Sequence, residues 1–415
     1  MKIAIIGGGA SGFFLAIHVK QAAPSSQVVI LEKSSRPLIK VGLSGGGRCN
    51  LTNTFEHIDD ISQAYPRGAR LMKRLLREFS PADACRWFEE HGVPLVAQDD
   101  DCVFPVVQDS AAVVGCLTRV ACGLGVEVRL RQPVRAVTRD PSGMLKVYVG
   151  DEERGYDLFD KVAVTTGGSP RGEGHAWLAA LGQEIEPPCP SLYTFAITHK
   201  ALNDLMGLVV EHTVLSLPGT KFRSRGPLLV THWGISGPAV LKLSSYAARH
   251  LCRNGYRSPL LVCWTGDTDT ERVRKQLTEL FARSPHKQIG SLRPFGLQQR
   301  LWGYLVERCG LSVTQSCGEP GGKSLNRLAA LLTADAYQIE GKGHFRDEFV
   351  TCGGVSLTSV NVRTLESKKC PGLYFAGEVL DIDGITGGFN LQAAWSTAFV
   401  AARAISRQML SREQS

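Results

Sequence analysis

The chain has 415 residues, room for two or three domains, and its 43% apolar and 21% charged residues are typical of a globular protein. It contains no stretch of about 20 apolar residues and no N-terminal signal segment, and its twelve cysteines include no C-x-x-C pair. These features argue against a membrane span and a metal site and predict a soluble cytoplasmic protein, while the net charge of +8 is compatible with an acidic partner such as RNA.

The first predicted elements are a strand, a helix and a second strand, which form one βαβ unit: Lys2–Ile6, Ser11–Ala22 and Gln27–Leu31. Residues 42–53 are rich in Gly, Ser and Asn, which predicts a loop without regular structure. Helices are expected over 67–91, with a break at Pro81, and over 109–123.

Short β-type runs come next, in two groups separated by a proline-rich segment at 187–190: 126–130, 134–138, 145–149 and 162–165, then 193–198, 208–217, 227–232 and 259–264. The turn at 140–143 predicts a hairpin between the second and third runs. The remaining patterns are helices at 270–283, 297–309 and 324–334, a strand at 350–357 and a long helix at 389–410.

The turn after the first strand carries a dinucleotide-binding pattern, G-x-G-x-x-G, at residues 7–12. Gly7 allows the tight turn, Gly9 lets the backbone approach a pyrophosphate, and Gly12 lets the helix pack closely on the strand. The N-terminus of the following helix presents N–H groups and a positive dipole end to the phosphates. Glu32 ends the next strand, where it is placed to accept hydrogen bonds from a ribose.

A second nucleotide-type segment lies near the C-terminus, where a strand ending in Gly377-Glu378 precedes a glycine-rich loop and the long helix. This pattern resembles the flavoprotein family of glutathione reductase and the succinate dehydrogenase flavoprotein, and Thr166-Gly167 resembles the strand end that passes close to their cofactor. The resemblance implies FAD, with the long helix stabilising negative charge on the reduced flavin. Because no second G-x-G-x-x-G follows a strand, we expect no dedicated NADPH domain: either NAD(P)H binds transiently in the substrate cleft, or the reductant is another carrier.

More specific motifs occur at 44–53 (SGGGRCNLTN), 231–239 (THWGISGPA), 353–355 (GGV), 377–381 (GEVLD) and 387–392 (GGFNLQ). Together they resemble the bacterial YhiN-type flavoproteins of the BaiN/RdsA family over essentially the whole chain. The resemblance implies an α/β fold in which a Rossmann-like FAD-binding domain of the glutathione reductase type is interrupted by an inserted β-rich domain with a small helical subdomain. The corresponding boundaries are 1–190 and 346–415 for the FAD domain, 191–345 for the insert and about 268–338 for its helical part.

The predicted cofactor residues are drawn from the two nucleotide-type segments and the family motifs. They are Gly7, Gly9, Ala10, Ser11, Gly12, Glu32, Lys33, Lys40, Ser44, Gly45, Gly46, Asn50, Val134, Thr166, Gly167, Gly377, Glu378, Asp381, Gly387, Gly388, Phe389, Asn390 and Leu391.

Three residues are candidates for the chemistry, which in this family is reduction of a conjugated C=C bond. Cys49, in the glycine loop, either supplies the proton or only packs against the flavin. His232 either faces the flavin across a cleft or is structural. Arg48 binds a substrate anion or the cofactor, or forms a structural ion pair.

Basic side chains form a stripe on the first predicted helix after the glycine loop: Arg67, Arg70, Lys73, Arg74 and Arg77. The stripe is either a phosphate-binding face or an ordinary solvated face. Further basic residues in the insert are Lys221, Arg223, Arg225, Arg272, Arg274 and Lys275.

Activities in the family are of two kinds, and both remain open here. The leading hypothesis is reduction of uridine to dihydrouridine in large-subunit ribosomal RNA, and the alternative is a small-molecule enone reductase of the 3-oxo bile acid type. A third possibility is a flavin-binding RNA or assembly factor without turnover. The chain departs from the family at 169–174, 342–348 and 385–386, near the expected active site, and its oligomeric state stays open.

Overall fold

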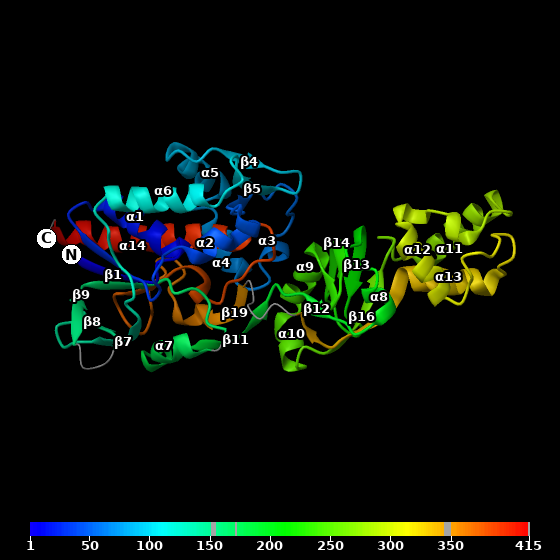
Figure 1. Cartoon of the computed structure of the whole chain (residues 1–415). Coiled ribbons are helices and arrows are strands. Elements are labelled where there is room, and N and C mark those ends of the chain that lie inside the picture. The colour runs from blue at the N-terminus through cyan, green and yellow to red at the C-terminus, as the bar shows by residue number, and fades with distance from the viewer. Residues whose placement is uncertain (151–154, 171, 344–349, 414–415) are drawn as a thin grey trace. The chain divides into compact units, whose positions relative to one another are not determined.

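The computed structural model describes residues 1–150, 155–170, 172–343 and 350–413 (Figure 1). The chain divides into two compact units. The first unit combines both ends of the sequence, Met1–Cys189 with Val350–Ser415, and the second is Pro190–Phe349. Of the domain boundaries expected from the sequence, the one at 345 lies outside the described residues.

The first unit is built on a five-stranded parallel sheet with the order β20-β10-β1-β2-β6. Its strands are β1 (Lys2–Ile6), β2 (Gln27–Leu31), β6 (Glu127–Arg129), β10 (Lys161–Val164) and β20 (Leu373–Phe375). The side chains of Ile3, Ala4 and Ile5 have no exposed area, as expected in a parallel sheet. Because β20 comes from the C-terminal part of the chain, that part completes the sheet.

The helices of this unit bring distant parts of the sequence together. α1 (Ala10–Ala22) connects β1 to β2 and packs against α6 (Ala111–Gly123) and α14 (Phe389–Glu413) (Figure 1). Since β1, β10 and β20 run parallel, the segments that follow their carboxyl ends meet at one edge of the sheet. This edge receives the glycine turn, the Thr166-Gly167 segment and the Gly377-Glu378 segment.

Three smaller sheets, β3-β5-β4, β7-β8-β9 and β11-β19, surround the parallel one. Their strands are β3 (Thr52–Asn53), β4 (Leu95–Ala97), β5 (Cys102–Pro105), β7 (Val134–Arg139), β8 (Leu145–Val149), β9 (Tyr156–Phe159), β11 (Ile185–Ser191) and β19 (Val350–Val355). The hairpin predicted at 140–143 is confirmed, because β7 and β8 pair antiparallel and the Asp140 carboxylate accepts a hydrogen bond from the Met144 N–H at 3.1 Å.

The helices predicted over 67–91 with a break at Pro81 are confirmed as α4 (Ala69–Leu75) and α5 (Pro81–Glu90). Pro81 begins α5, because proline fits the first turn of a helix, and Ser80 and Asp83 form a capping box there. The expectation that 42–53 contains no regular structure is wrong at both ends, since α2 (Ile39–Leu43) and β3 extend into this segment.

The second unit contains a seven-stranded antiparallel sheet with the order β17-β16-β13-β14-β15-β12-β18. Its strands are β12 (Phe195–Ala196), β13 (Val209–Ser216), β14 (Arg223–Thr231), β15 (Gly234–Ser236), β16 (Ser258–Cys263), β17 (Asp335–Ile339) and β18 (Gly341–Lys342). Its helices are α8 (Lys200–Asn203), α9 (Pro238–Tyr246), α10 (Ala248–Arg253), α11 (Thr270–Arg283), α12 (Gln299–Arg308) and α13 (Gly322–Ala334). The last three confirm the predicted helical patterns.

Two features are absent from the described ranges of the chain. None of the helices in those ranges is long and apolar enough to cross a bilayer. The same residues contain no group of three or more His, Cys, Asp or Glu side chains that could hold a metal ion.

The partly buried His18 of α1 makes the stability of the first unit depend on pH. Its ring lies against Phe14 and Trp87, and burial lowers the pKa of His18 to about 4 despite a hydrogen bond with the Phe14 carbonyl. Between the unfolded pKa of about 6.5 and about 4, only the unfolded chain binds this proton, so stability is expected to fall by on the order of 3 kcal/mol as the pH drops through that window. Urea unfolding at pH 7, 5.5 and 4 measures the loss.

The matched comparison uses one partly buried histidine and one exposed histidine. His18→Gln should flatten the pH dependence of the unfolding free energy between pH 6.5 and 4, whereas the same change at the exposed His286 should leave the wild-type slope in place. Equal slopes in the wild type and in His18→Gln would contradict this assignment.

Candidate cofactor site

The glycine turn after β1 is closely packed on its protein side. Gly7 has φ +112°, and a Cβ added there would lie 2.5 Å from the carbonyl oxygen of Thr165. A Cβ added at Gly12 would collide with the carbonyl oxygen of Gly7 and lie 2.9 Å from Thr165 Oγ1. The Thr165 hydroxyl donates to the Gly7 carbonyl at 2.8 Å. Both positions therefore require glycine for backbone packing alone.

Gly9 differs from these two glycines, because a Cβ added there meets no atom of the described residues within 4 Å. Gly9 is the N-cap of α1, has no side-chain cap, and is followed by Ala10 and Ser11 in a first turn without acidic residues. The first N–H groups of a helix lack intrahelical partners and attract anions. The turn is thus packed tightly behind Gly9 and open in front of it, as a pyrophosphate requires.

Glu32 lies at the end of β2, beside the glycine turn. Its carboxylate accepts hydrogen bonds from the Gly8 N–H at 2.7 Å and the Ser34 N–H at 2.8 Å, and also from the Ser34 hydroxyl. The side chain is nearly buried, whereas that of Lys33 is exposed. The Glu32 carbonyl accepts the Gln132 N–H at 2.8 Å, which brings the segment leading to Val134 alongside.

The loop at 44–47 is a second piece of open backbone. It begins at Ser44 and forms a 3-10 turn whose glycines Gly45, Gly46 and Gly47 have φ values of +58°, +69° and +88°. Cβ atoms added at Gly46 or Gly47 meet nothing in the described residues within 4 Å, whereas one at Gly45 would lie 2.7 Å from the Asn50 N atom. This loop is therefore fixed from one side and bare on the other, like the turn at Gly9.

Asn50 joins this loop to the N-terminus of α14. In the orientation that satisfies both of its polar atoms, its side-chain nitrogen donates to the Thr52 carbonyl at 3.0 Å and its oxygen accepts the Gly388 N–H at 3.2 Å. The indole N–H of Trp395 donates to the Leu51 carbonyl at 3.0 Å. The Thr52 hydroxyl donates to Gln392 Oε1 at 2.6 Å. The glycine loop and the helix N-terminus thus form one rigid group.

The turn before α14 is held by its own polar contacts. The Asn390 side chain accepts the Gly384 N–H at 2.8 Å and donates to the Gly384 carbonyl at 2.9 Å. The Tyr65 hydroxyl donates to the Phe389 carbonyl at 2.8 Å. Gly387 and Gly388 have φ values of +127° and +86°, and a Cβ at Gly387 would lie 2.8 Å from the Phe389 ring. Leu391, in the first turn of α14, is half-buried.

The Glu378 side chain lies close to two other predicted cofactor residues, Lys40 and Gly167. Its carboxylate accepts the Thr351 N–H at 2.8 Å and pairs with Lys40 at 3.1 Å. A Cβ added at Gly167, next to the exposed Thr166, would lie 3.5 Å from Glu378 Oε2.

Two backbone contacts fix the neighbours of Glu378. The Gly377 N–H donates to Thr397 Oγ1 of α14 at 2.8 Å, and a Cβ at Gly377 would lie 2.6 Å from Ser11 Oγ of α1. The Asp381 N–H donates to the Val355 carbonyl at 2.9 Å. The predicted segments from both ends of the sequence thus meet at one edge of the parallel sheet.

Of the three candidates for the chemistry, Arg48 and Cys49 lie in this group. The Arg48 guanidinium stacks on the Phe104 ring at 4.2 Å and makes 3.3 Å hydrogen bonds to the Gly45 carbonyl and to Gln108. These contacts support the glycine loop from behind, which favours a structural role for Arg48, although through stacking rather than through an ion pair. His232 follows β14 in the second unit, is exposed, and contacts the ring of Trp233 edge-on; its place facing the flavin stays a prediction.

Cys49 is fully buried and has φ +64°, a conformation that non-glycine residues seldom adopt. Burial raises the pKa of the Cys49 thiol to about 11, with an opposing contribution from its hydrogen bond to Ser44. A thiol with no exposed area favours the packing role. We expect Cys49→Ala to lower the melting temperature but to change kcat by less than about threefold, whereas loss of a proton donor costs on the order of 100-fold or more. A kcat loss of that size with FAD still bound would contradict the packing role.

Sequence reasoning missed the polar groups that hold the site together from inside α14. Gln392, Ser396 and Thr397 have no exposed area, and Gln392 Nε2 and the Ser396 hydroxyl both bond to the Phe79 carbonyl. The sequence did contain a signal for these buried polar groups, because the three polar residues interrupt an otherwise apolar stretch of the predicted long helix. No pattern in the sequence indicated that the Thr351 N–H would donate a hydrogen bond to Glu378.

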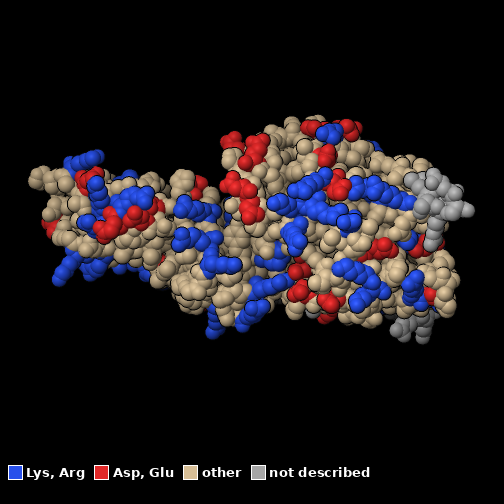
Figure 2. Space-filling model, turned by 180° about the vertical axis from the view of Figure 1, so that it is seen from behind, with Lys and Arg blue, Asp and Glu red and all other residues tan. Residues whose placement is uncertain are grey.

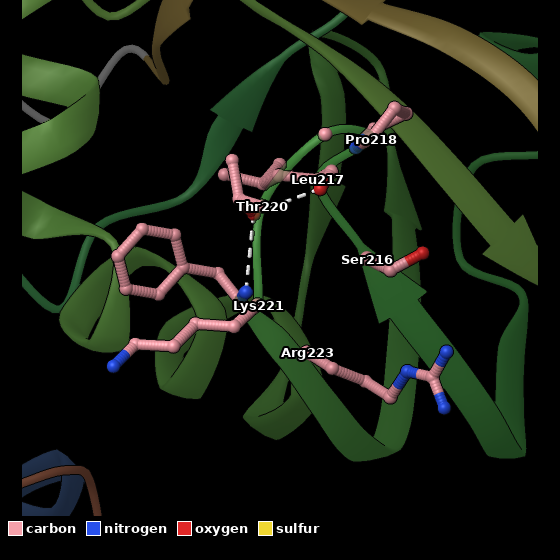
Figure 3. Close-up of a pocket in the computed structure, with 8 residues that line it drawn as sticks. Ser216, Leu217, Pro218, Thr220, Lys221 and Arg223 are labelled. Carbon is pink, nitrogen blue, oxygen red and sulfur yellow. Dashed lines mark hydrogen bonds between the residues drawn. The ribbon is translucent and has the colours of Figure 1, made fainter.

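A hollow of about 390 Å³ lies elsewhere, at the turn between β13 and β14 of the second unit (Figure 3). It is lined by Ser216, Leu217, Pro218, Gly219, Thr220, Lys221, Phe222 and Arg223. Lys221 and Arg223 extend away from each other in Figure 3, so their charges do not converge on one ligand. The Thr220 hydroxyl is used within the turn, since it donates to the Leu217 carbonyl at 2.8 Å and accepts the Phe222 N–H at 3.1 Å.

Comparison with known proteins agrees with this geometry. Residues 1–404 match the family described as "HI0933-like protein Rossmann domain". The chain is 30% identical to the ribosomal RNA dihydrouridine synthase of Escherichia coli K12, covering 96% of both chains. It is 27% identical to the 3-dehydro-bile acid delta(4,6)-reductase of Clostridium scindens, covering 97% of this chain and 98% of that one.

Among solved structures, the 3-ketosteroid delta1-dehydrogenase from Sterolibacterium denitrificans has the same fold, with a TM-score of 0.53 at 11% identity over 98% of this chain and 99% of that one. These comparisons confirm the predicted fold class, a Rossmann-like FAD-binding domain in an α/β protein, and the predicted class of enzyme, an FAD-dependent oxidoreductase. They also confirm the resemblance stated from the sequence motifs: the chain belongs to the HI0933-like family.

Proposed function

We propose that the protein reduces the conjugated C=C bond of a uridine in large-subunit ribosomal RNA to dihydrouridine, with NAD(P)H as the transient electron donor. The flavin part of this proposal is carried by one observation: two glycine segments, the turn at Gly9 and the loop at Gly46 and Gly47, are packed against protein on one side and open on the other. The RNA part is supported by the Escherichia coli relative and by the basic surplus of the chain.

The residues at this edge fit the parts of FAD in order. The open turn at Gly9 and the first N–H groups of α1 would hold the pyrophosphate, and Glu32 would hold the adenosine ribose. Glu378, fixed by the Thr351 N–H, would accept hydrogen bonds from the ribityl chain. The bare face of the Gly46-Gly47 loop and the N-terminus of α14 would flank the isoalloxazine ring.

Bound FAD would supply the hydride for one carbon of the double bond, and the chain must deliver a proton to the neighbouring carbon. Cys49 is poorly suited to this, because its thiol is buried and its side chain supports the loop. In the proposal His232 remains the candidate proton donor, since its imidazole is exposed. The positive dipole end at the N-terminus of α14 would stabilise negative charge on the reduced flavin.

One observation favours the alternative, a small-molecule enone reductase. Four large aliphatic side chains are strongly exposed on the segments that flank the glycine loop, at 50%, 72%, 54% and 65%: Ile39, Leu43, Val106 and Val107. The Ser110 N–H and hydroxyl bond to the Gly47 and Gly42 carbonyls at 2.8 Å each, so the two segments lie close together. An apolar rim of this kind suits a steroid-like ligand, which buries most of its surface.

The test is to delete the gene and map dihydrouridine in ribosomal RNA. The proposal predicts that at least one dihydrouridine disappears and returns when the wild-type gene, but not a His232→Ala variant, is supplied. An unchanged modification map would overturn the RNA substrate. Oxidation of NAD(P)H by the purified enzyme that is stimulated by 3-oxo enones and not by ribosomal RNA would instead establish the alternative.

A further inference from the structure

Two helices of the first unit together form a strongly basic surface, which we call the basic ridge. Its residues are Arg70, Lys73, Arg74 and Arg77 of α4 and the turn after it, with Arg403 and Arg407 of α14. The α4 residues follow helical spacing at 70, 73, 74 and 77, and the α14 residues are four apart, so each set shares one face. The two helices pack together, and Figure 2 shows a band of Lys and Arg across the first unit.

Few acidic side chains neutralise the positive charge of the basic ridge. Glu78 pairs with Arg403 at 2.7 Å and with Arg74 at 4.0 Å, and these contacts, with the nearby Arg407, hold the pKa of the Glu78 carboxyl below its usual range. In the described part of the chain, Arg70, Lys73 and Arg77 are exposed and form no ion pair. The pKa of the exposed Asp60 is lowered first by its hydrogen bonds with Ser62 and only to a smaller degree by Lys73, which forms no ion pair with it. Among the described side chains, these six cations therefore share one ion-paired carboxylate, that of Glu78.

Arg67, which the sequence places in the same stripe, does not belong to the ridge. Its guanidinium is almost buried and forms a two-pronged ion pair with the fully buried Asp383, one of its hydrogen bonds measuring 2.6 Å. The pair joins the segment before α4 to the loop before α14. The prediction that Arg67 belongs to the basic stripe is therefore wrong, because its side chain turns inward to the buried carboxylate of Asp383.

The composition of the ridge fits one kind of partner. Five of its six cations are arginines, whose planar guanidinium groups bind phosphate oxygens bidentately. No large apolar side chain of α4 or of the described part of α14 is strongly exposed, so the ridge offers nothing to insert into a bilayer or to anchor a protein partner. We propose that the basic ridge binds the phosphodiester backbone of RNA, an inference that rests on the proposed RNA substrate.

The fold sets how far this contact lies from the reacting base. Phe389, at the start of α14, belongs to the cofactor site, and Arg403 and Arg407 follow 14 and 18 residues later. At 1.5 Å per residue these cations lie about 21 and 27 Å along the helix. With about 3.4 Å per nucleotide of a stacked strand, the ridge would contact phosphates on the order of six to eight nucleotides from the uridine. RNA shorter than this would not use the far end of the ridge.

The test compares two double variants of the FAD-loaded full-length protein. Arg70→Gln with Arg77→Gln removes two unpaired ridge cations. Arg272→Gln with Arg274→Gln removes the same charge from α11, where Arg272 pairs with Asp269 and Arg274 with Glu271. Affinity for a large-subunit ribosomal RNA fragment is measured by fluorescence anisotropy as a function of salt, with FAD content and melting temperature recorded for each protein.

The ridge variant should lower the slope of log K against log salt by about 1.4 to 1.8, which corresponds to about 25- to 60-fold weaker binding at 0.1 M salt, while the α11 variant follows the wild type. Equal salt slopes for the ridge variant and the wild type would contradict RNA binding by the basic ridge. Equal losses of RNA affinity in the ridge variant and the α11 variant would contradict it as well. If the ridge variant loses RNA affinity but gene deletion leaves the dihydrouridine map unchanged, RNA binding by the basic ridge is supported and the proposed uridine reduction is contradicted.

Discussion

Replacing Gly9 with alanine is expected to weaken FAD binding by about 5- to 140-fold while leaving the protein folded. The added methyl meets no described residue within 4 Å, so nothing in the protein itself opposes it. It would occupy the open space in which the pyrophosphate must approach the helix N-terminus, and overpacking by one methyl costs about 1–3 kcal/mol. Titration of the apoprotein with FAD, followed by flavin fluorescence, measures the loss.

Two other glycine-to-alanine changes serve as references. Gly12→Ala should lower both FAD affinity and melting temperature, because its methyl collides with the Gly7 carbonyl and approaches Thr165. Gly115→Ala, in the exposed middle of α6, should raise stability by about 0.5–1 kcal/mol and leave FAD affinity unchanged. FAD affinity equal to wild type in Gly9→Ala would contradict the assignment of the pyrophosphate to this turn.

Breaking the Arg67–Asp383 pair is expected to destabilise the first unit by about 3–5 kcal/mol, the largest stability effect that we predict. Asp383 has no exposed area, so Arg67→Met would leave its carboxylate buried without the partner that lies opposite it. Since Asp383 directly precedes the Gly384–Gly388 turn at the N-terminus of α14, FAD affinity should fall with stability. Urea unfolding followed by circular dichroism, with and without FAD, measures both effects.

The control is the double variant Arg67→Met with Asp383→Leu. Apolar residues of similar size often replace a buried ion pair at little cost, so the double variant should recover most of the stability that the single variant loses. A double variant no more stable than Arg67→Met would show that the pair does not act as a unit. A single variant as stable as the wild type would show that the pair contributes nothing.

The strands and the glycine turn at the glycine-lined edge of the parallel sheet could be predicted from the sequence because their signals are local. β1 and β2 have the predicted bounds, since each is a short apolar run next to a glycine turn or a helix. Gly7, Gly9 and Gly12 were given different tasks from one motif, and the packing around them differs accordingly. The hairpin at 140–143 and helix α11 were also predictable from the sequence. Asp140 and the helix cap Asp269 form their hydrogen bonds with residues two to four positions further along the chain.

The contacts that decide the rest join residues far apart in the chain. The bonds from Thr52 to Gln392 and from Arg67 to Asp383 span more than 300 residues, and no local pattern announces them. α9 was missed because it is short and contains two serines, although Gly237 and Pro238 mark its start. For Cys49 the sequence left both a proton donor and a packing residue open, and only the fold shows that its side chain is fully buried.

The central claim is that the glycine-lined edge of the parallel sheet holds FAD, and the flavin content of the purified protein tests it most directly. We expect yellow protein that releases about one FAD per chain on denaturation, and stripped protein that regains it on incubation with FAD. A colourless protein that takes up no FAD would mean that this bare backbone serves some other ligand.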